Sequence, residues 1–134
     1  MQITRIFHSG FLVETAKRYF IFDYYKGELP KLNPDKPVYV SASHGHQDHY
    51  EPKVFELLKQ QGIVPKLAIL AKDIKEKKYP DGIPVLKAGF HAHYEIEADF
   101  LVDTFHSTDA GVAYLVTCGE GKIYHAGDLH DWVF

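Results

Sequence analysis

Short runs of apolar, β-branched and aromatic residues recur along almost the whole chain, and they restrict it to a fold built mainly of strands. The run PVYVS, at residues 37–41, is nearly continuous in apolar residues, as expected of a strand buried on both faces. One segment differs, because EPKVFELLKQQG places its apolar side chains on one helical face and ends at Gly62. Segment 72–78 is basic and is predicted to be helix or loop with a solvated face. The predicted strands cover residues 1–7, 11–15, 18–25, 37–41, 67–71, 84–87, 93–97, 100–105, 112–117 and 122–125.

Length and composition are those of one intracellular domain. The chain has 134 residues, of which 46% are hydrophobic, so residues 1–134 are predicted to form a single domain with a substantial core. The net charge of −3 provides no basic surface for coating nucleic acid, and no apolar run approaches the roughly 18–20 residues of a membrane span. The single cysteine, Cys118, rules out an internal disulfide framework, and MQITRIFHSG lacks the apolar stretch of a signal peptide. We therefore expect a cytoplasmic protein.

Four potential metal ligands are concentrated in the segment SHGHQDHY. They are His44, His46, Asp48 and His49, and they follow the predicted buried strand directly. Imidazole nitrogens and carboxylate oxygens suit Zn²⁺, and also Fe or Mn, whereas a closed structural zinc site usually uses cysteine. His44 and His46 are placed to face one point, and the adjacent Asp48 and His49 are placed to serve a second point nearby.

Two later segments offer further ligands at the ends of predicted strands. In FHSTDAGVAYLV, His106 follows one strand and precedes a turn of small residues. In IYHAGDLHDW, Asp128 follows another strand, after a glycine that permits a sharp turn. Sites assembled from loops at one edge of stacked sheets are common, so we expect both residues to join the cluster. This agreement of spacing, strand context and distant partners disfavours the alternative, a polar surface loop.

Taken together, these motifs resemble those of the metallo-β-lactamase-fold hydrolases. The match consists of His-x-His-x-Asp-His after a buried strand, a lone histidine 57 residues later, and a Gly-Asp pair that ends 22 residues after that histidine. The N-terminal HSGFLVET, with Asp23 ending the next strand, is similar to small cytoplasmic members related to the ascorbate-6-phosphate lactonases. The resemblance implies an α+β fold, the four-layer αββα sandwich, of which we expect the N-terminal portion here.

The resemblance also implies a role for each candidate residue. His44, His46 and His106 would bind a first metal, Asp48 and His49 a second, and Asp128 would bridge the two. Asp23 would orient the loop at residues 43–50, called the metal loop below, from behind. An aspartate that ends a strand has an equally common structural role. The family usually supplies one more histidine to the second metal from a later strand. This chain ends before such a segment, so we expect it to be the first part of a longer protein with a weaker second site.

The activity implied by the resemblance is hydrolysis by metal-activated water. Two metal ions about 3.5–4 Å apart lower the pKa of a shared water to about 7, and Asp48 is the expected catalytic proton acceptor. We expect two Zn²⁺, with Mn²⁺ or Fe as alternatives, and a small ester, lactone or phosphate-bearing substrate. The alternative functions are a phosphodiesterase or nuclease of the same fold, which would carry an inserted basic arm that this chain lacks, and a truncated, non-catalytic metal-binding domain. We expect no membrane or nucleic-acid partner, and we expect copies of the chain to associate.

Overall fold

The structure, a computed structural model, describes residues 1–7, 10–46, 49–106, 111–119, 121–125 and 132–133. Most of the regular secondary structure is strand, as the sequence predicts. The described helices are α1 (Lys53–Gln60) and the short 3₁₀ helix η1 (Glu76–Lys78). The strands are β1 (Gln2–Phe7), β2 (Gly10–Glu14), β3 (Tyr19–Phe22), β4 (Val38–Ala42), β5 (Leu67–Ala71), β6 (Val85–Ala88), β7 (His93–Glu97), β8 (Phe100–His106), β9 (Val112–Cys118), β10 (Gly121–His125) and β11 (Trp132–Val133).

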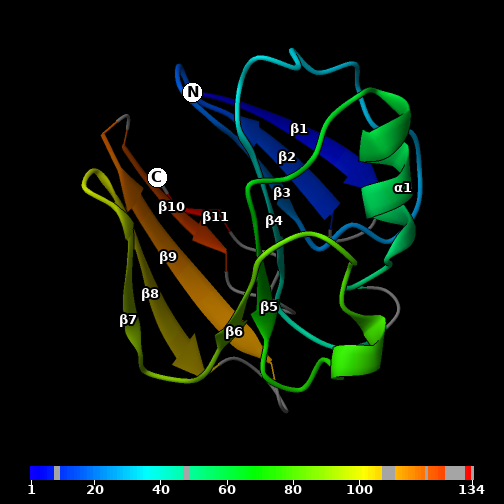
Figure 1. The fold of residues 1–134 in the computed structure, drawn as a ribbon. Helices are drawn as coiled ribbons and strands as arrows, with labels where there is room; N and C mark the ends of the chain where they lie inside the picture. The colour runs from blue at the N-terminus through cyan, green and yellow to red at the C-terminus, as the bar shows by residue number, and fades with distance from the viewer. Residues whose placement is uncertain (8–9, 47–48, 107–110, 120, 126–131, 134) are drawn as a thin grey trace.

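The strands form two sheets that pack face to face (Figure 1). The first sheet has the order β1-β2-β3-β4-β5-β6, antiparallel from β1 to β3 and parallel from β3 to β6. The second has the order β11-β10-β9-β8-β7 and is antiparallel between all its neighbours. Because parallel strands end at the same edge of a sheet, the loops that follow β3, β4 and β5 lie together.

One apolar core lies between the two sheets. Strand β8 shows how it forms, because Phe100 and Val102 are buried while the alternate residue Leu101 is only partly buried. The ring of Phe100 meets those of Phe20 and Tyr39, from the first sheet, edge to face, with centroids 5.3 and 4.8 Å apart. Such aromatic contacts add to the area that is buried, so these rings join the sheets firmly.

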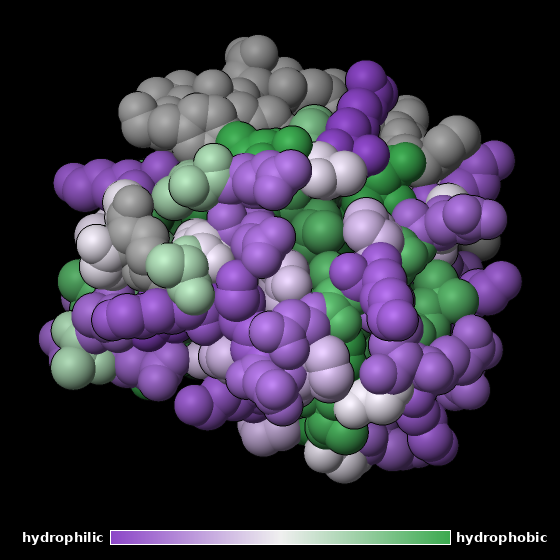
Figure 2. Space-filling view, turned by 90° about the horizontal axis from the view of Figure 1, so that it is seen from above, coloured by the Kyte–Doolittle hydropathy of each residue, from purple (hydrophilic) through white to green (hydrophobic). Residues whose placement is uncertain are grey.

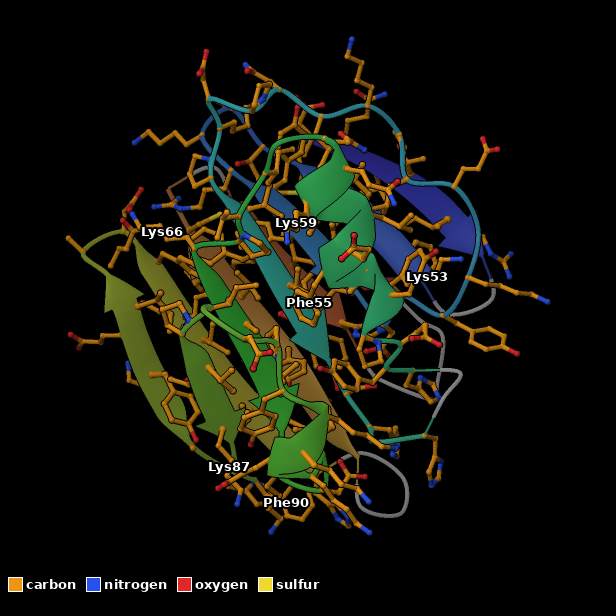
Figure 3. All side chains as sticks on the ribbon, turned by 45° about the vertical axis from the view of Figure 1, so that its right-hand side comes forward. Lys53, Phe55, Lys59, Lys66, Lys87 and Phe90 are labelled. Carbon is orange, nitrogen blue, oxygen red and sulfur yellow. The ribbon has the colours of Figure 1, made fainter. Side chains whose placement is uncertain are left out.

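Helix α1 covers the opposite face of the first sheet (Figure 3). Val54 and Leu58 of the helix are buried against a second apolar cluster that includes Ile21 and Val40. Strands β3 and β4 are therefore buried on both faces, which explains why PVYVS and the preceding aromatic strand contain almost no polar residues. Phe55 packs at the margin of both clusters.

A charged network joins the two sheets at one end of the sandwich. Arg18 is buried just before β3, and its guanidinium lies 2.5 Å from Asp99 and 3.4 Å from Glu97, which flank the β7–β8 turn. The hydroxyl of Tyr39 donates a hydrogen bond of 2.6 Å to Glu97. This hydrogen bond lowers the pKa of Glu97, helped by Lys66 and Arg18, and the Arg18 hydrogen bond lowers the pKa of Asp99.

The predicted elements agree with the observed ones, with one correction. The strand expected at 18–25 is shorter, Tyr19–Phe22, because Asp23 adopts a φ of 50° and leaves the extended conformation. In the basic segment 72–78, only Glu76–Lys78 is helical. Of the four expected layers, the described residues form three: α1 and the two sheets.

The surface at the top of Figure 1 is mostly hydrophilic, with apolar side chains showing between the polar ones (Figure 2). This is the end opposite to the one where β8 ends (Figure 1). Within the described part of the chain, no helix has the length and apolar character needed to cross a membrane.

Candidate metal centre

In the loop after β4, the ring of His44 contacts the rings of two other predicted ligands, His46 and His49. That strand is buried along its length and leads directly into Ser43 and His44, which are also buried. The centroid of the His44 ring lies 5.4 Å from that of His46 and 4.9 Å from that of His49. His49 is buried as well, whereas His46 is exposed to solvent. The cluster therefore has a buried base and one accessible ring, and its binding of a metal stays a prediction.

Asp23 lies behind this loop, fully buried at the end of β3. One of its carboxylate oxygens accepts a hydrogen bond of 2.7 Å from the Ser43 N–H, and the other accepts one of 2.5 Å from the Ser43 hydroxyl. The second oxygen also lies 2.9 Å from Nδ1 of His49. A carboxylate accepts and does not donate, so Nδ1 of His49 is the donor in this contact. Asp23 thus has the contacts of a residue that orients the metal loop.

A buried histidine of the second sheet approaches the same carboxylate. His125, at the end of β10, places Nε2 3.6 Å from Oδ2 of Asp23, and its ring lies 5.2 Å from that of Phe22. The sequence reasoning did not assign His125 to the site. The signal was its position, because Ile123 and His125 are the two buried residues of β10 and point to the same side of the strand.

Gly111, which precedes β9, contacts the His44 ring through its backbone. A Cβ atom on Gly111 would lie 2.0 Å from Nε2 of His44, so no larger residue fits without moving the ring. The next residue, Val112, donates its N–H to the carbonyl oxygen of Ser43 at 2.8 Å. The start of β9 is thereby fixed against the metal loop, and the absence of a side chain at Gly111 is a steric requirement of this arrangement.

Asp73 supports the other side of the metal loop. It follows β5, and its Oδ2 accepts a hydrogen bond of 3.0 Å from the Gly45 N–H. The backbone is also close, because a Cβ on Gly45 would lie 3.1 Å from the Asp73 carbonyl oxygen. Gly45 stands between two predicted ligands, so Asp73 helps to set how His44 and His46 are presented. No feature of the sequence singled out Asp73 from the other charged residues of its segment.

His106, the predicted ligand from the second sheet, ends β8 at the same edge. It pairs across the sheet with Val112, whose N–H bonds to the metal loop. The His106 ring lies 4.5 Å from the ring of Phe90, centroid to centroid, and is exposed to solvent. The Phe90 ring also makes a cation–π contact with Lys72, whose Nζ lies 3.9 Å from the centre of the ring.

Two buried tyrosines tie the loop to its surroundings. The Tyr114 hydroxyl donates a 2.8 Å hydrogen bond to the carbonyl oxygen of Ala42, which ends β4. The Tyr50 hydroxyl, one residue after His49, donates a 2.5 Å hydrogen bond to the carbonyl oxygen of Lys78. Burial raises the pKa of both phenols well above its ordinary value, so both remain protonated donors at neutral pH.

The donor chemistry of this edge fits a divalent metal of the zinc type. Imidazoles predominate among the described residues, and Asp23 orients the His49 ring through its contact with Nδ1. Asp48 and Asp128, the carboxylate ligands of the prediction, lie outside the described residues. Within the described ranges, no three His, Cys, Asp or Glu residues are grouped closely enough to hold a metal ion.

Comparison with known proteins agrees with the fold and with the motifs. A family model described as beta-lactamase superfamily domain matches residues 2–132. A "UPF0173 metal-dependent hydrolase" of Korarchaeum cryptofilum is 27% identical over 142 residues, which cover 96% of this chain and 60% of that protein. A protein with the same description from Pyrobaculum calidifontis is 27% identical over 139 residues, covering 96% and 61% of the two chains. The chain therefore spans about three fifths of the length of these relatives.

A solved structure shows the same architecture. It is Igni18, described as a novel metallo hydrolase from the hyperthermophilic archaeon Ignicoccus hospitalis, and it superposes with a TM-score of 0.65 over 93% of this chain and 59% of its own. The sequence identity is 17%, so this likeness concerns the fold. The predicted metallo-β-lactamase sandwich is confirmed. Because the family model covers almost all residues of this chain, the chain belongs to the family described as beta-lactamase superfamily domain.

Proposed function

We propose that the protein is a metal-dependent hydrolase. One observation carries the proposal: the rings of His44, His46 and His49 gather at a single edge of the sandwich, and a buried carboxylate fixes one of them. Structural zinc sites usually include cysteine, whereas sites built from imidazole and carboxylate ligands with accessible positions are typical of catalysis. The curated relatives are described as metal-dependent hydrolases, which supports the same proposal.

The proposed cofactor is a pair of Zn²⁺ ions, with Mn²⁺ or Fe as alternatives that the same ligands accept. When bound, such ions supply a hydroxide-like nucleophile at neutral pH and polarise the bond that is broken. His44, His46 and His106 would hold one ion, and His49 would hold the second through Nε2, with Asp48 and Asp128 completing the set. Asp23 keeps the proton on Nδ1 of His49, and Asp48 is the proposed acceptor of the proton from water.

The proposed substrate is a small molecule that contains an ester, lactone or phosphate ester. The resemblance of the N-terminal motif to small lactonases supports this class, and the net charge of −3 disfavours nucleic acid. Cys118, the single cysteine of the chain, is a buried thiol outside any disulfide, which is consistent with the reducing cytoplasm as the proposed location. Association between copies of the chain also remains a proposal.

The direct test is metal content per chain, measured by elemental analysis of protein purified without added metal. His46→Ala is the test variant. His93→Ala is the matched control, because His93 is an exposed histidine on β7 whose Nδ1 lies 2.6 Å from Asp103. We expect about two metals in the wild type and in the control, and fewer than one in the test variant.

Other metal contents have distinct meanings. One metal that depends on His46 would restrict the proposal to the first site. The absence of metal from the wild type, or its retention in His46→Ala, would refute the proposal for this chain. Hydrolysis of a simple lactone and of bis-nitrophenyl phosphate then separates lactonase from phosphodiesterase activity, and a metal-loaded protein that is inactive on both would favour a non-catalytic metal-binding domain.

A further inference from the structure

A cavity of about 320 Å³ opens beside the metal loop. The exposed ring of His46 forms part of its wall, so the cavity adjoins a proposed metal ligand. It is large enough for a phosphoryl or carboxylate group together with part of the molecule that carries it. The residues that line it are Gly45, His46, Asp73, Ile74, Lys75, Lys77 and Lys78.

The segment that carries the three lysines is held in a fixed position. Ile74 is buried in the core between the sheets, and η1 forms a compact turn directly after it. At the end of that turn the Lys78 carbonyl oxygen accepts the hydrogen bond from Tyr50, which neighbours His49. The backbone that presents the lysines is therefore anchored to the core and to the metal loop, although their side chains reach solvent.

The charge of the cavity wall differs in sign from that of the whole protein. Three lysines face one carboxylate, that of Asp73, and this carboxylate already accepts the Gly45 N–H. The chain as a whole has a net charge of −3. A fourth cation, Lys72, stacks on the Phe90 ring, which packs against His106. Cationic side chains thus border two of the proposed metal ligands.

We propose that this cavity binds an anionic group, phosphoryl or carboxylate, of the substrate, and that Lys75, Lys77 and Lys78 supply the attraction. This inference rests on the proposed hydrolase function, because it assigns the cavity to the substrate of that site. Lysines provide several donors and a positive charge for such a group, and a concave wall strengthens their combined field. A substrate held there by its anionic end extends toward His46, where the bond to be broken meets the metal site.

The test uses metal-free protein, so that anion binding is measured without a metal. Inorganic phosphate is titrated into the wild type, and binding is followed by the NMR shifts of the backbone amides of Gly45 and Ile74. Succinate is titrated in a second series, which distinguishes carboxylate from phosphoryl preference. The test variant is K75Q/K77Q/K78Q. The matched control is K31Q/K59Q/K122Q, which removes the same charge from exposed lysines elsewhere; Lys59, for example, lies well away from Phe90 (Figure 3).

We expect the dissociation constant of the preferred anion to rise about tenfold in K75Q/K77Q/K78Q, because three exposed charge contacts are lost together, and to stay within about twofold in the control. Circular dichroism on each variant checks that the fold is retained, and single K75Q, K77Q and K78Q variants provide the same comparison if the triple variant does not fold. Equal weakening in test and control variants, or no binding of either anion by the wild type, would overturn the proposal. Because metal content is measured separately, a failed metal site and a failed anion site give different results.

Discussion

Replacing Asp23 by asparagine isolates the chemical role of this carboxylate from its structural one. Asparagine has the same shape and tolerates the φ of 50° at this position, so the backbone needs no adjustment. The amide oxygen can still accept the Ser43 N–H. However, an NH₂ group then replaces the oxygen that faces the Ser43 hydroxyl and Nδ1 of His49. The hydroxyl can rotate and accept, whereas the imidazole must change tautomer.

The expected effects differ for stability and for metal binding. A hydrogen bond to a charged group contributes about 1.5–3 kcal/mol and a neutral one about 0.5–1.5 kcal/mol, so metal-free Asp23→Asn should lose about 1–2 kcal/mol of unfolding free energy. The tautomer change places a proton on Nε2 of His49, the nitrogen proposed to bind the second metal. Loss of such an orienting partner typically weakens metal binding about 10–100-fold. The ion proposed for His44 and His46 should be affected much less.

Two measurements test this expectation. Urea unfolding of the metal-free proteins gives the stability difference, and competition with a zinc chelator gives the affinity of each site. Asp103→Asn is the control, because Asp103 makes a similar contact of 2.6 Å to His93 on the surface. A folded Asp23→Asn protein whose two zinc affinities are unchanged would refute the tautomer argument. An equal loss in Asp103→Asn would show that the effect is not specific to the metal loop.

Three further predictions concern the supports of the site and of the sandwich. Gly111→Ala should displace the His44 ring, destabilise the protein by about 1–3 kcal/mol and abolish metal binding at the first site. Gly89→Ala is the control, because the nearest atom is 4.0 Å from the added Cβ, and it should bind metal normally in the same chelator competition. Asp73→Ala should weaken zinc binding about tenfold, whereas Asp73→Asn, which retains an acceptor for the Gly45 N–H, should keep the wild-type affinity. Equal affinities for the two variants would contradict the proposed support of the metal loop by Asp73. Arg18→Met should destabilise the protein at pH 7. Because contact with Arg18 lowers the pKa of Asp99, this stabilisation is present above the ordinary carboxyl pKa of 3.8 and is lost as Asp99 is protonated. Urea unfolding should therefore show the difference between the two proteins shrinking as the pH falls below 3.8, whereas a pH-independent difference would assign the effect to packing.

The sequence predicted those features that depend on residues close together in the chain. Alternation within strands and the helical spacing of EPKVFELLKQQG located the elements to within a few residues, because these patterns express local geometry. The concentration of histidines after PVYVS likewise indicated the candidate site, whose binding of metal stays a prediction; three of its rings come from one loop.

The supports of the site depend on contacts between distant segments, and the sequence did not reveal them. Asp73 lies among six neighbours that include four lysines and a glutamate, and only the packing of η1 brings its carboxylate to Gly45. His125 belongs to an ordinary strand pattern, and only the docking of the second sheet brings it to Asp23. The lysines of segment 72–78 were expected to be solvated for the same reason, since their position beside His46 depends on tertiary structure.

The metal loop is also the place where the two halves of the chain meet. Tyr114 and Ala42, joined by one hydrogen bond there, are 72 residues apart in sequence, so the loop acquires its final shape only after the second sheet has docked on the first. Pairings between such distant segments are slow to form, because the entropy of closing the intervening chain is lost before the contact is made. Since metal binding is coupled to the structure that assembles its ligands, high-affinity zinc uptake should be among the last events of refolding, and its rate would report when the sandwich closes.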